Sequence, residues 1–171
     1  MLYLIDANAI IDAKDLYFAM DQVPEYWTWL VHQGQSGQVK IPTEIFEEIS
    51  PGRDKEHPFF TWRKDKATAE ALLLDEEADP ATVQRVLTQG YASDLNDNEI
   101  EQIGRDPFLI AYALSGIERI VVSTEVSKPT LTRHNRRLPD VCKQFGIQCV
   151  NTFQMNRALE WRTSWRSRVA R

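Results

Sequence analysis

Short apolar runs alternate with segments of helical periodicity along much of the chain. The run 2–5 (LYLI) is β-prone and stops at Asp6. The apolar positions that follow recur every three or four residues, which predicts a helix: Ile10, Ala13, Tyr17 and Met20. A second strand is expected at 39–41 and a second helix from Thr43, because Pro42 marks the boundary between them.

The same alternation returns in the last third of the chain. Two strands, 119–122 and 147–150, and three helices, 106–114, 138–145 and 152–165, are expected there. Strands that alternate with helices predict a mainly parallel sheet covered on both faces. We therefore expect an α/β fold with a mainly parallel central sheet of four to five strands flanked by helices.

The middle of the chain has a more polar pattern. Residues 53–104 carry two expected helices, 67–74 and 82–87, which the acidic run 75–77 separates. We interpret 53–104 as a helical insertion within a single domain that spans 1–171.

Composition fits one globular domain, since 171 residues with 43% hydrophobic side chains are enough to bury a core. The net charge of −5 argues at first against a nucleic-acid partner, because such proteins usually carry a basic surface. The charge is unevenly distributed, however. Residues 1–125 hold 10 basic and 23 acidic side chains, a net −13, and residues 126–171 hold 10 basic and 2 acidic, a net +8. The total charge therefore does not exclude RNA.

Nothing in the sequence indicates a membrane or secretion signal. No apolar run approaches the roughly 18 residues of a membrane-spanning helix, and no cleavage site follows the N-terminal run. We expect a cytoplasmic protein with no membrane partner. Cys142 and Cys149 flank a Gly146 turn in an apolar setting, so we expect buried, reduced thiols. The three histidines lack the spacing of zinc ligands.

Acidic residues stand near the ends of the expected strands. Asp6 follows the first strand, and Glu44 and Glu48 lie on the helix after the second. Asp106 begins the helix before the third strand, and Glu125 follows that strand. Ligands of parallel sheets bind at the carboxyl ends of the strands. Carboxylates that meet there repel one another unless a divalent cation neutralises them, and all-oxygen ligands suit Mg²⁺ or Mn²⁺.

Four segments resemble the motifs of PIN-domain ribonucleases and occur in the same order: LIDANAIID, IPTEIFEEI, DPFLIAYAL and VVSTE. That superfamily includes the VapC-type toxins of bacteria. The closing LPDVCKQFGIQCVN resembles a small bacterial PIN-like subgroup catalogued largely as a domain of unknown function. The resemblance implies a PIN-like three-layer fold and metal-dependent hydrolysis of RNA phosphodiester bonds. It also implies the toxin of a type II toxin–antitoxin pair, with an antitoxin partner and, as is common among such toxins, a homodimer.

The resemblance also implies roles for individual residues. Asp6 and Asp106 match the central metal-bridging acids, and Glu48 and Glu125 match outer or second-ion ligands. Ser123 and Glu125 depart from the family's Thr-x-Asp pattern, since Ser replaces Thr and Glu replaces Asp. The supporting residues, which orient carboxylates or phosphate or assist the ligands, are Asn8, Glu44, Ser123 and Thr124.

Basic residues follow the fourth motif directly. Arg133, Arg136 and Arg137 are the expected RNA contacts, because guanidinium groups bind phosphates well. Further arginines near the C-terminus alternate with Trp161 and Trp165. This second group fits either RNA binding, with bases stacked on the indoles, or a solvated helix face with Trp161 packed in the core.

Each acid also has a purely structural interpretation. Asp106 before Pro107 is a common helix start, and Asp6 could cap the first helix. Glu44, Glu47 and Glu48 could simply complement a helix dipole, and Glu125 could be an ordinary polar residue of a loop. Two other functions also stay open. One is a catalytically silent PIN scaffold that binds RNA or a protein. The other is a haloacid dehalogenase-like phosphohydrolase with Asp6 as nucleophile, although Asn8 stands where that family usually has an Asp.

Overall fold

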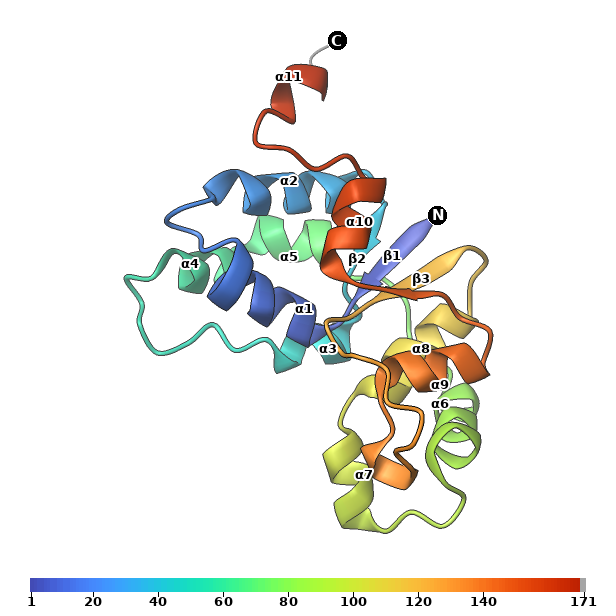
Figure 1. The fold of residues 1–171 in the computed structure, drawn as a ribbon. Helices are drawn as coiled ribbons and strands as arrows, with labels where there is room; N and C mark the ends of the chain where they lie inside the picture. Colours follow the sequence, from blue (N-terminus) through green and yellow to red (C-terminus); the bar gives the residue numbers. More distant parts are fainter. Residues whose placement is uncertain (170–171) are drawn as a thin grey trace.

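The protein is described here from a computed structural model, over residues 1–169 (Figure 1). Within these residues the strands form one four-stranded sheet in the order β2-β1-β3-β4, and every neighbouring pair is parallel. The strands are β1 (Leu2–Ile5), β2 (Val39–Lys40), β3 (Arg119–Val122) and β4 (Cys149–Val150). The expected α/β class with a mainly parallel sheet of four to five strands is confirmed.

Helices fill the connections between the strands. Between β1 and β2 lie α1 (Ala7–Asp12), the π-helical turn η1 (Ala13–Tyr17) and α2 (Pro24–Gln35). Between β2 and β3 lie α3 (Thr43–Glu48), α4 (Pro58–Lys64), α5 (Lys66–Leu72), α6 (Pro80–Arg85), the π-helical turn η2 (Val86–Tyr91), α7 (Asp97–Ile103) and α8 (Asp106–Leu114). The last part of the chain forms the 3-10 turn η3 (Arg133–Asn135), α9 (Leu138–Gln144), α10 (Thr152–Ala158) and α11 (Arg166–Val169).

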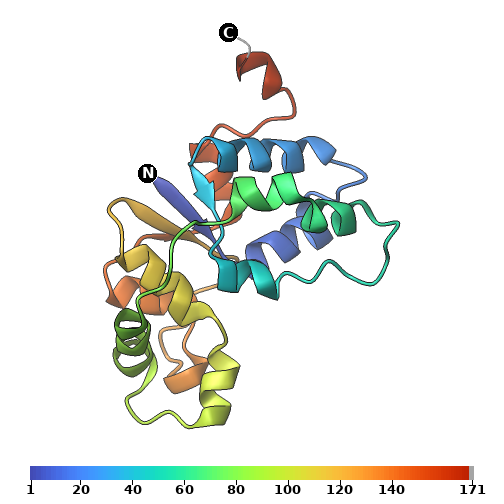
Figure 2. The same cartoon turned by 180° about the vertical axis from the view of Figure 1, so that it is seen from behind.

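The helices form a layer on each side of the sheet (Figures 1 and 2). Helices α1, α2, α5 and α10 lie on one side, and α6, α8 and α9 lie on the other. Leu4 of β1 and Val121 of β3 are fully buried, as expected for central strands that both layers cover. The arrangement is consistent with the PIN-like three-layer fold expected from the sequence.

The sheet has a topological switch point between its two central strands. From β1 the chain continues to β2 on one side, and from β3 it continues to β4 on the other. At such a point the loops after the two strands diverge and leave a crevice where ligands bind. Asp6 directly follows β1, and Ser123 directly follows β3.

Residues 53–104 are helical and pack on the central fold. Helix α5 lies against α2, where Gly34 allows close approach, because a Cβ at that position would lie 2.6 Å from the Ala71 carbonyl oxygen. Leu73 continues the sheet edge through a parallel bridge to Ile41. Helix α6 and η2 pack on α8. The segment therefore contributes to both helical layers.

An aromatic cluster joins α2 to the C-terminal segment. The Tyr26 ring stacks on Phe18 with a centroid distance of 3.9 Å, and Trp161 lies 5.3 Å from both Tyr26 and Trp29. Trp161 is therefore partly buried and packs against the core. The expectation of one helix over 152–165 is wrong, because α10 ends at Ala158. The chain turns back through Glu160, whose φ of 54° is left-handed, and this turn brings the Trp161 indole into the cluster.

Two further expectations concern cysteines and membranes. Cys142 and Cys149 are both free thiols; Cys142 is buried and Cys149 is partly buried. Among the helices of residues 1–169, none is long and apolar enough to span a bilayer.

Candidate functional site

Asp6 lies buried at the switch point, with only 3% of its surface exposed. The Ser123 hydroxyl donates a hydrogen bond of 2.8 Å to Asp6 Oδ2, and the same oxygen of Ser123 accepts one of 3.2 Å from the Glu125 amide. Asp6 occupies the N-cap position of α1, but its carboxylate makes no capping hydrogen bond. Burial raises the pKa of Asp6 to about 6, and the negative charges of Glu125 and Glu48 add to this effect against the Ser123 hydrogen bond.

Asp106 is the second carboxyl of the site, and it is partly buried. The interpretation of Asp106 as a helix cap is wrong, because the N-cap of α8 is Arg105 and Asp106 is already inside the helix. The Tyr91 hydroxyl instead donates a 3.3 Å hydrogen bond to Asp106 Oδ2. Burial raises the pKa of Asp106 well above its usual value, and the charges of Asp6 and Glu125 raise it further. The two aspartates thus share one poorly solvated site.

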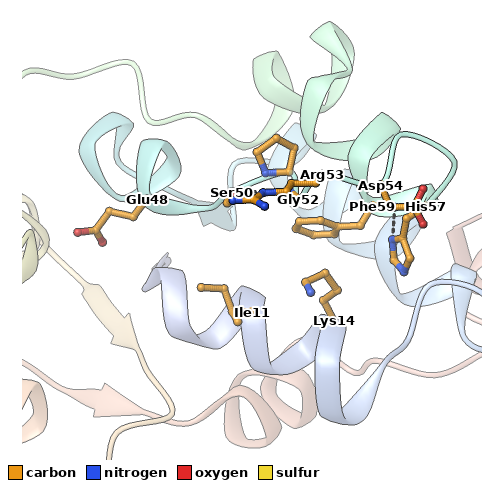
Figure 3. Close-up of a pocket in the computed structure, with 10 residues that line it drawn as sticks. Ile11, Lys14, Glu48, Ser50, Gly52, Arg53, Asp54, His57 and Phe59 are labelled. Carbon is orange, nitrogen blue, oxygen red and sulfur yellow. Dashed lines mark hydrogen bonds between the residues drawn. The ribbon is translucent and has the colours of Figure 1, made fainter.

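Glu48 lies at the more open side of this site. It is the last residue of α3, is exposed to solvent, and points away from the helix (Figure 3). Its charge contributes to the raised pKa of both Asp6 and Asp106. Partial burial raises the pKa of Glu48 itself, whereas Arg105 lowers it. Glu48 therefore lies within electrostatic range of Asp6 and Asp106.

Glu125 connects the site to α9. Its Oε2 accepts a 2.9 Å hydrogen bond from the Leu138 amide, and its Oε1 lies 3.5 Å from Arg137 Nη1. Both carboxylate oxygens are thereby engaged at the first turn of α9. The extra methylene of glutamate, compared with aspartate, lengthens the reach of this carboxylate towards α9.

Glu48 and Glu125 thus raise the pKa values of Asp6 and Asp106, but the four acids predicted at the sheet edge do not form a closed metal site. Over residues 1–169, no group of three or more His, Cys, Asp or Glu side chains is arranged to hold a metal ion. The donor set nevertheless fits Mg²⁺ or Mn²⁺ in its chemistry, because it consists of carboxylate oxygens. A divalent cation would also offset the repulsion that raises the pKa values of Asp6 and Asp106.

The expected supporting residues divide into two groups. Ser123 contacts Asp6 directly, whereas Asn8 is exposed on the first turn of α1 and Thr124 is half-buried after β3. Glu44 is directed elsewhere, since its Oε1 accepts a 3.3 Å hydrogen bond from the Tyr112 hydroxyl. Glu44 is not among the main causes of the raised pKa of either aspartate.

The expected RNA-binding arginines are mostly engaged within the fold. Arg133 contacts Glu99 through Nε at 2.7 Å and Nη2 at 2.8 Å, and it contacts Asp94 at 2.7 Å. The hydrogen bonds that Glu99 accepts lower its pKa to about 2, and those from Arg133 have the largest effect. Arg136 donates to the Gly90 carbonyl and, at 2.5 Å, to Gln144 Oε1. Of the three predicted contacts, Arg137 is the one beside the acidic site.

Two residues of the site were not singled out from the sequence. Tyr91 reaches Asp106 from η2, and Arg105 lies near Glu48 at the start of α8. Neither residue belongs to a recognisable motif. Tyr91 is a single aromatic residue in a polar segment. The adjacent basic Arg105 and acidic Asp106 were a weak signal that sequence reasoning did not use.

The fold and the site define an α/β protein with a group of acidic residues at the switch point of a parallel sheet. The family model described as a domain of unknown function (DUF4411) matches residues 3–163, and the chain belongs to this family. This assignment is compatible with the resemblance of the closing segment to a subgroup of unknown function. Neither the curated proteins nor the solved structures contain a match to the chain.

Proposed function

We propose that the protein is a Mg²⁺- or Mn²⁺-dependent endoribonuclease that hydrolyses RNA phosphodiester bonds. One observation carries the proposal: buried Asp6 and partly buried Asp106 lie within electrostatic range of each other, and each has a raised pKa. Partial or full desolvation of two mutually repelling carboxyls lowers stability, and such perturbed groups concentrate at functional sites. The proposal extends the resemblance of the four acidic motifs to those of PIN-domain ribonucleases.

In this proposal, Asp6 and Asp106 hold the divalent ion, and Glu48 and Glu125 act as outer or second-ion ligands. When bound, the ion lowers the pKa of an attacking water and stabilises charge on the departing 3′ oxygen. Ser123 orients the Asp6 carboxylate, and Tyr91 orients that of Asp106. Asn8 and Thr124 lie within two residues of Asp6 and Ser123 in the sequence. In this proposal they hydrogen-bond the phosphate.

We further propose that this ribonuclease is the toxin of a type II toxin–antitoxin pair in the bacterial cytoplasm. The support is the resemblance to VapC-type toxins. The antitoxin would cover the acidic site, and two copies of the toxin would form a homodimer. Expression of the wild type should arrest growth, whereas Asp6→Asn should not; equal growth of the two strains would contradict a toxin.

A catalytically silent scaffold is the second candidate, and one observation favours it. Both oxygens of Glu125 are engaged by Leu138 and Arg137, so this acid is less available to a metal than the other three. A scaffold of this kind would bind RNA or a protein partner without cleaving it.

One experiment separates these candidates. Purified protein is incubated with end-labelled structured RNA in Mg²⁺ or Mn²⁺, beside Asp6→Asn, Asp106→Asn and the exposed control Asp21→Asn. Metal-dependent cleavage that both site variants lose and Asp21→Asn keeps supports the nuclease. RNA binding without cleavage supports the scaffold. A covalent phosphate trapped on Asp6 would instead indicate a phosphohydrolase.

A further inference from the structure

The two cysteines of the chain meet between α9 and β4. Cys142 lies on the last turn of α9 and Cys149 begins β4, and the chain between them turns back at Gly146, whose φ of 72° is left-handed. The Ile147 amide donates a 2.9 Å hydrogen bond to the Cys142 carbonyl and closes this turn. The Cys142 thiol hydrogen-bonds to that of Cys149. The sequence has no other cysteine, so no other thiol of the chain competes for either of them.

The two thiols differ in their access to solvent. Cys142 is fully buried, whereas Cys149 is partly buried and lines an open cavity of about 510 Å³. Pro139 and Lys143 of α9 form part of the opposite wall of this cavity. A small oxidant such as hydrogen peroxide can therefore approach Cys149, while the protein shields Cys142.

The hydrogen bond between the thiols also gives them different reactivity. It lowers the pKa of the Cys149 thiol against the effect of burial, and it raises the pKa of the Cys142 thiol, which is the donor. The thiolate, rather than the thiol, is the nucleophile that reacts with peroxides. Cys149 is therefore the first to react, and Cys142 is in place to react with the product.

We propose that Cys142 and Cys149 are a redox-active pair that a peroxide converts into a reversible intramolecular disulfide. The Cys149 thiolate attacks one peroxide oxygen: the S–O bond forms, the O–O bond breaks, and the departing oxygen takes up the proton that Cys149 lost and leaves as water or an alcohol. The Cys142 sulfur then attacks the Cys149 sulfur. The S–S bond forms, the S–O bond breaks, and hydroxide leaves as water with the Cys142 proton. The two thiols lose two electrons, which the peroxide gains, and a dithiol reductant reverses the reaction.

The elements that carry the thiols also hold residues of the acidic site. The first turn of α9 engages Glu125 through the Leu138 amide at 2.9 Å. The carbonyl of Val150, next to Cys149 in β4, accepts a 3.0 Å hydrogen bond from the Ser123 amide. A covalent bond between the sulfur atoms draws α9 towards β4, so it displaces Glu125 relative to Ser123. We therefore expect the oxidised chain to hydrolyse RNA more slowly, a consequence that rests on the proposed function.

Oxidation is measured on the native chain, so that the first test needs no variant. The protein is treated with a small excess of hydrogen peroxide, free thiols are alkylated in urea, and the mass is determined. The chain should lose the mass of two hydrogen atoms and take up no alkyl group, and dithiothreitol should restore two reactive thiols. Two alkylated cysteines, disulfide-linked dimers, or a chain that only gains oxygen would each overturn the proposal.

Two variants test the order of the reaction. In Cys142→Ser the reaction should stop at a Cys149 sulfenic acid, which dimedone traps. In Cys149→Ser the buried Cys142 should stay a free thiol. Cys142→Ala repeats the first variant without a buried hydroxyl, which guards against a loss of folding. If Cys142 is oxidised in Cys149→Ser as fast as Cys149 is in Cys142→Ser, the assigned roles are wrong.

Cleavage separates this inference from the proposed function. After the peroxide is removed, the oxidised chain should cleave RNA about tenfold more slowly than the reduced chain, and dithiothreitol should restore the rate. Cys149→Ser is the control and should cleave at one rate before and after peroxide. If the oxidised and reduced chains cleave equally fast, the link to the site fails and the nuclease stands. If neither cleaves RNA in any divalent metal but the disulfide forms, the nuclease fails and the thiol pair stands.

Discussion

The Ser123 hydroxyl hydrogen-bonds to Asp6 Oδ2 at 2.8 Å, across 117 positions of the chain. Because β1 and β3 are parallel neighbours, the residues that follow them meet at one edge of the sheet. The bond favours the ionised form of a carboxyl that burial would otherwise keep protonated. Ser123 is therefore part of the chemistry of Asp6 as well as a link between the central strands.

Replacement of Ser123 tests this link. Ser123→Ala removes the donor, so the pKa of Asp6 should rise above about 6. Ser123→Thr keeps a hydroxyl and should leave the pKa close to the native value. The measurement is the pH titration of the Asp6 carboxyl by NMR. An unchanged pKa in Ser123→Ala would show that the hydrogen bond has no influence.

The stability of the protein should fall as pH rises from about 4 to 7. The pKa of Asp6 is about 6 in the folded chain, against an ordinary value of 3.8. The folded state therefore binds the Asp6 proton more tightly than the unfolded state does. The stability that this tighter binding provides is lost as pH rises through about 6. At pH 7 the raised pKa of Asp6 lowers the free energy of unfolding by about 3 kcal/mol. The raised pKa of Asp106 acts in the same direction.

Asp6→Asn should remove part of this pH dependence and be more stable than the wild type at pH 7. The measurement is the free energy of unfolding in urea at several pH values. The exposed Asp21→Asn serves as the control and should follow the wild type. If the free energy of unfolding depends on pH in the same way in the wild type and in Asp6→Asn, Asp6 does not have a raised pKa in the folded state.

Divalent metal should stabilise the wild type against heat. An ion that binds only the folded state contributes about 2.7 kcal/mol at a concentration 100 times its Kd. The rise in Tm with Mg²⁺ or Mn²⁺ should be absent in Asp6→Asn and Asp106→Asn. It should also weaken as pH falls through about 6, where Asp6 becomes protonated. Glu44→Gln should keep the full effect, because Glu44 faces Tyr112.

Arg133 and Arg137 should differ in the effects of their replacement. Arg133→Ala should lower the free energy of unfolding at pH 7, because Arg133 contacts both Glu99 and Asp94. This difference from the wild type should disappear as pH falls from above 4.5 towards 2, where Glu99 becomes protonated. Urea unfolding across this pH range is the measurement.

Arg137→Ala should instead change the site. It removes the cation beside Glu125 and should leave stability close to that of the wild type, because Arg137 Nη1 lies 3.5 Å from Glu125 on the surface. We expect weaker RNA binding with a smaller dependence on salt than in Arg133→Ala. Equal salt dependence in the two variants would argue against an RNA contact at Arg137.

Tyr91→Phe tests how the middle segment of the chain supports the site. The loss of the hydroxyl should cost about 1 kcal/mol of stability and raise the pKa of Asp106 further, because the hydrogen bond from Tyr91 lowers it. Metal affinity should fall in calorimetric titrations. Tyr17→Phe is the control, since Tyr17 is exposed on η1 and distant in sequence from both residues.

Much of the central fold could be predicted from hydrophobic periodicity. The strands 2–5 and 119–122 and the helix 106–114 occur with the expected bounds, because each has a regular pattern and a clear break at its end. Helices α2 and α7 were not expected, although signals were present. Pro24 begins α2, and Asn96 and Glu99 form the capping box of α7.

Other features depend on contacts between distant parts of the chain. The end of α10 at Ala158 is one of them, since the partly buried Trp161 that follows packs against Tyr26 and Trp29 from a distant helix. The π-helical turn η2 that ends at Tyr91 has no simple periodicity to reveal it. The engagement of Arg133 by Glu99 was also hidden, because 34 positions separate them in the sequence.

The sequence by itself determined the α/β class and the order of acidic residues after the strands, since alternating periodicity and strand ends are local properties. Only the tertiary structure decided which side chains form the site. It brought Tyr91 to Asp106, turned Glu44 towards Tyr112 and engaged Glu125 at α9. Burial and the choice of partners control ionisation, and both depend on which distant segments pack together.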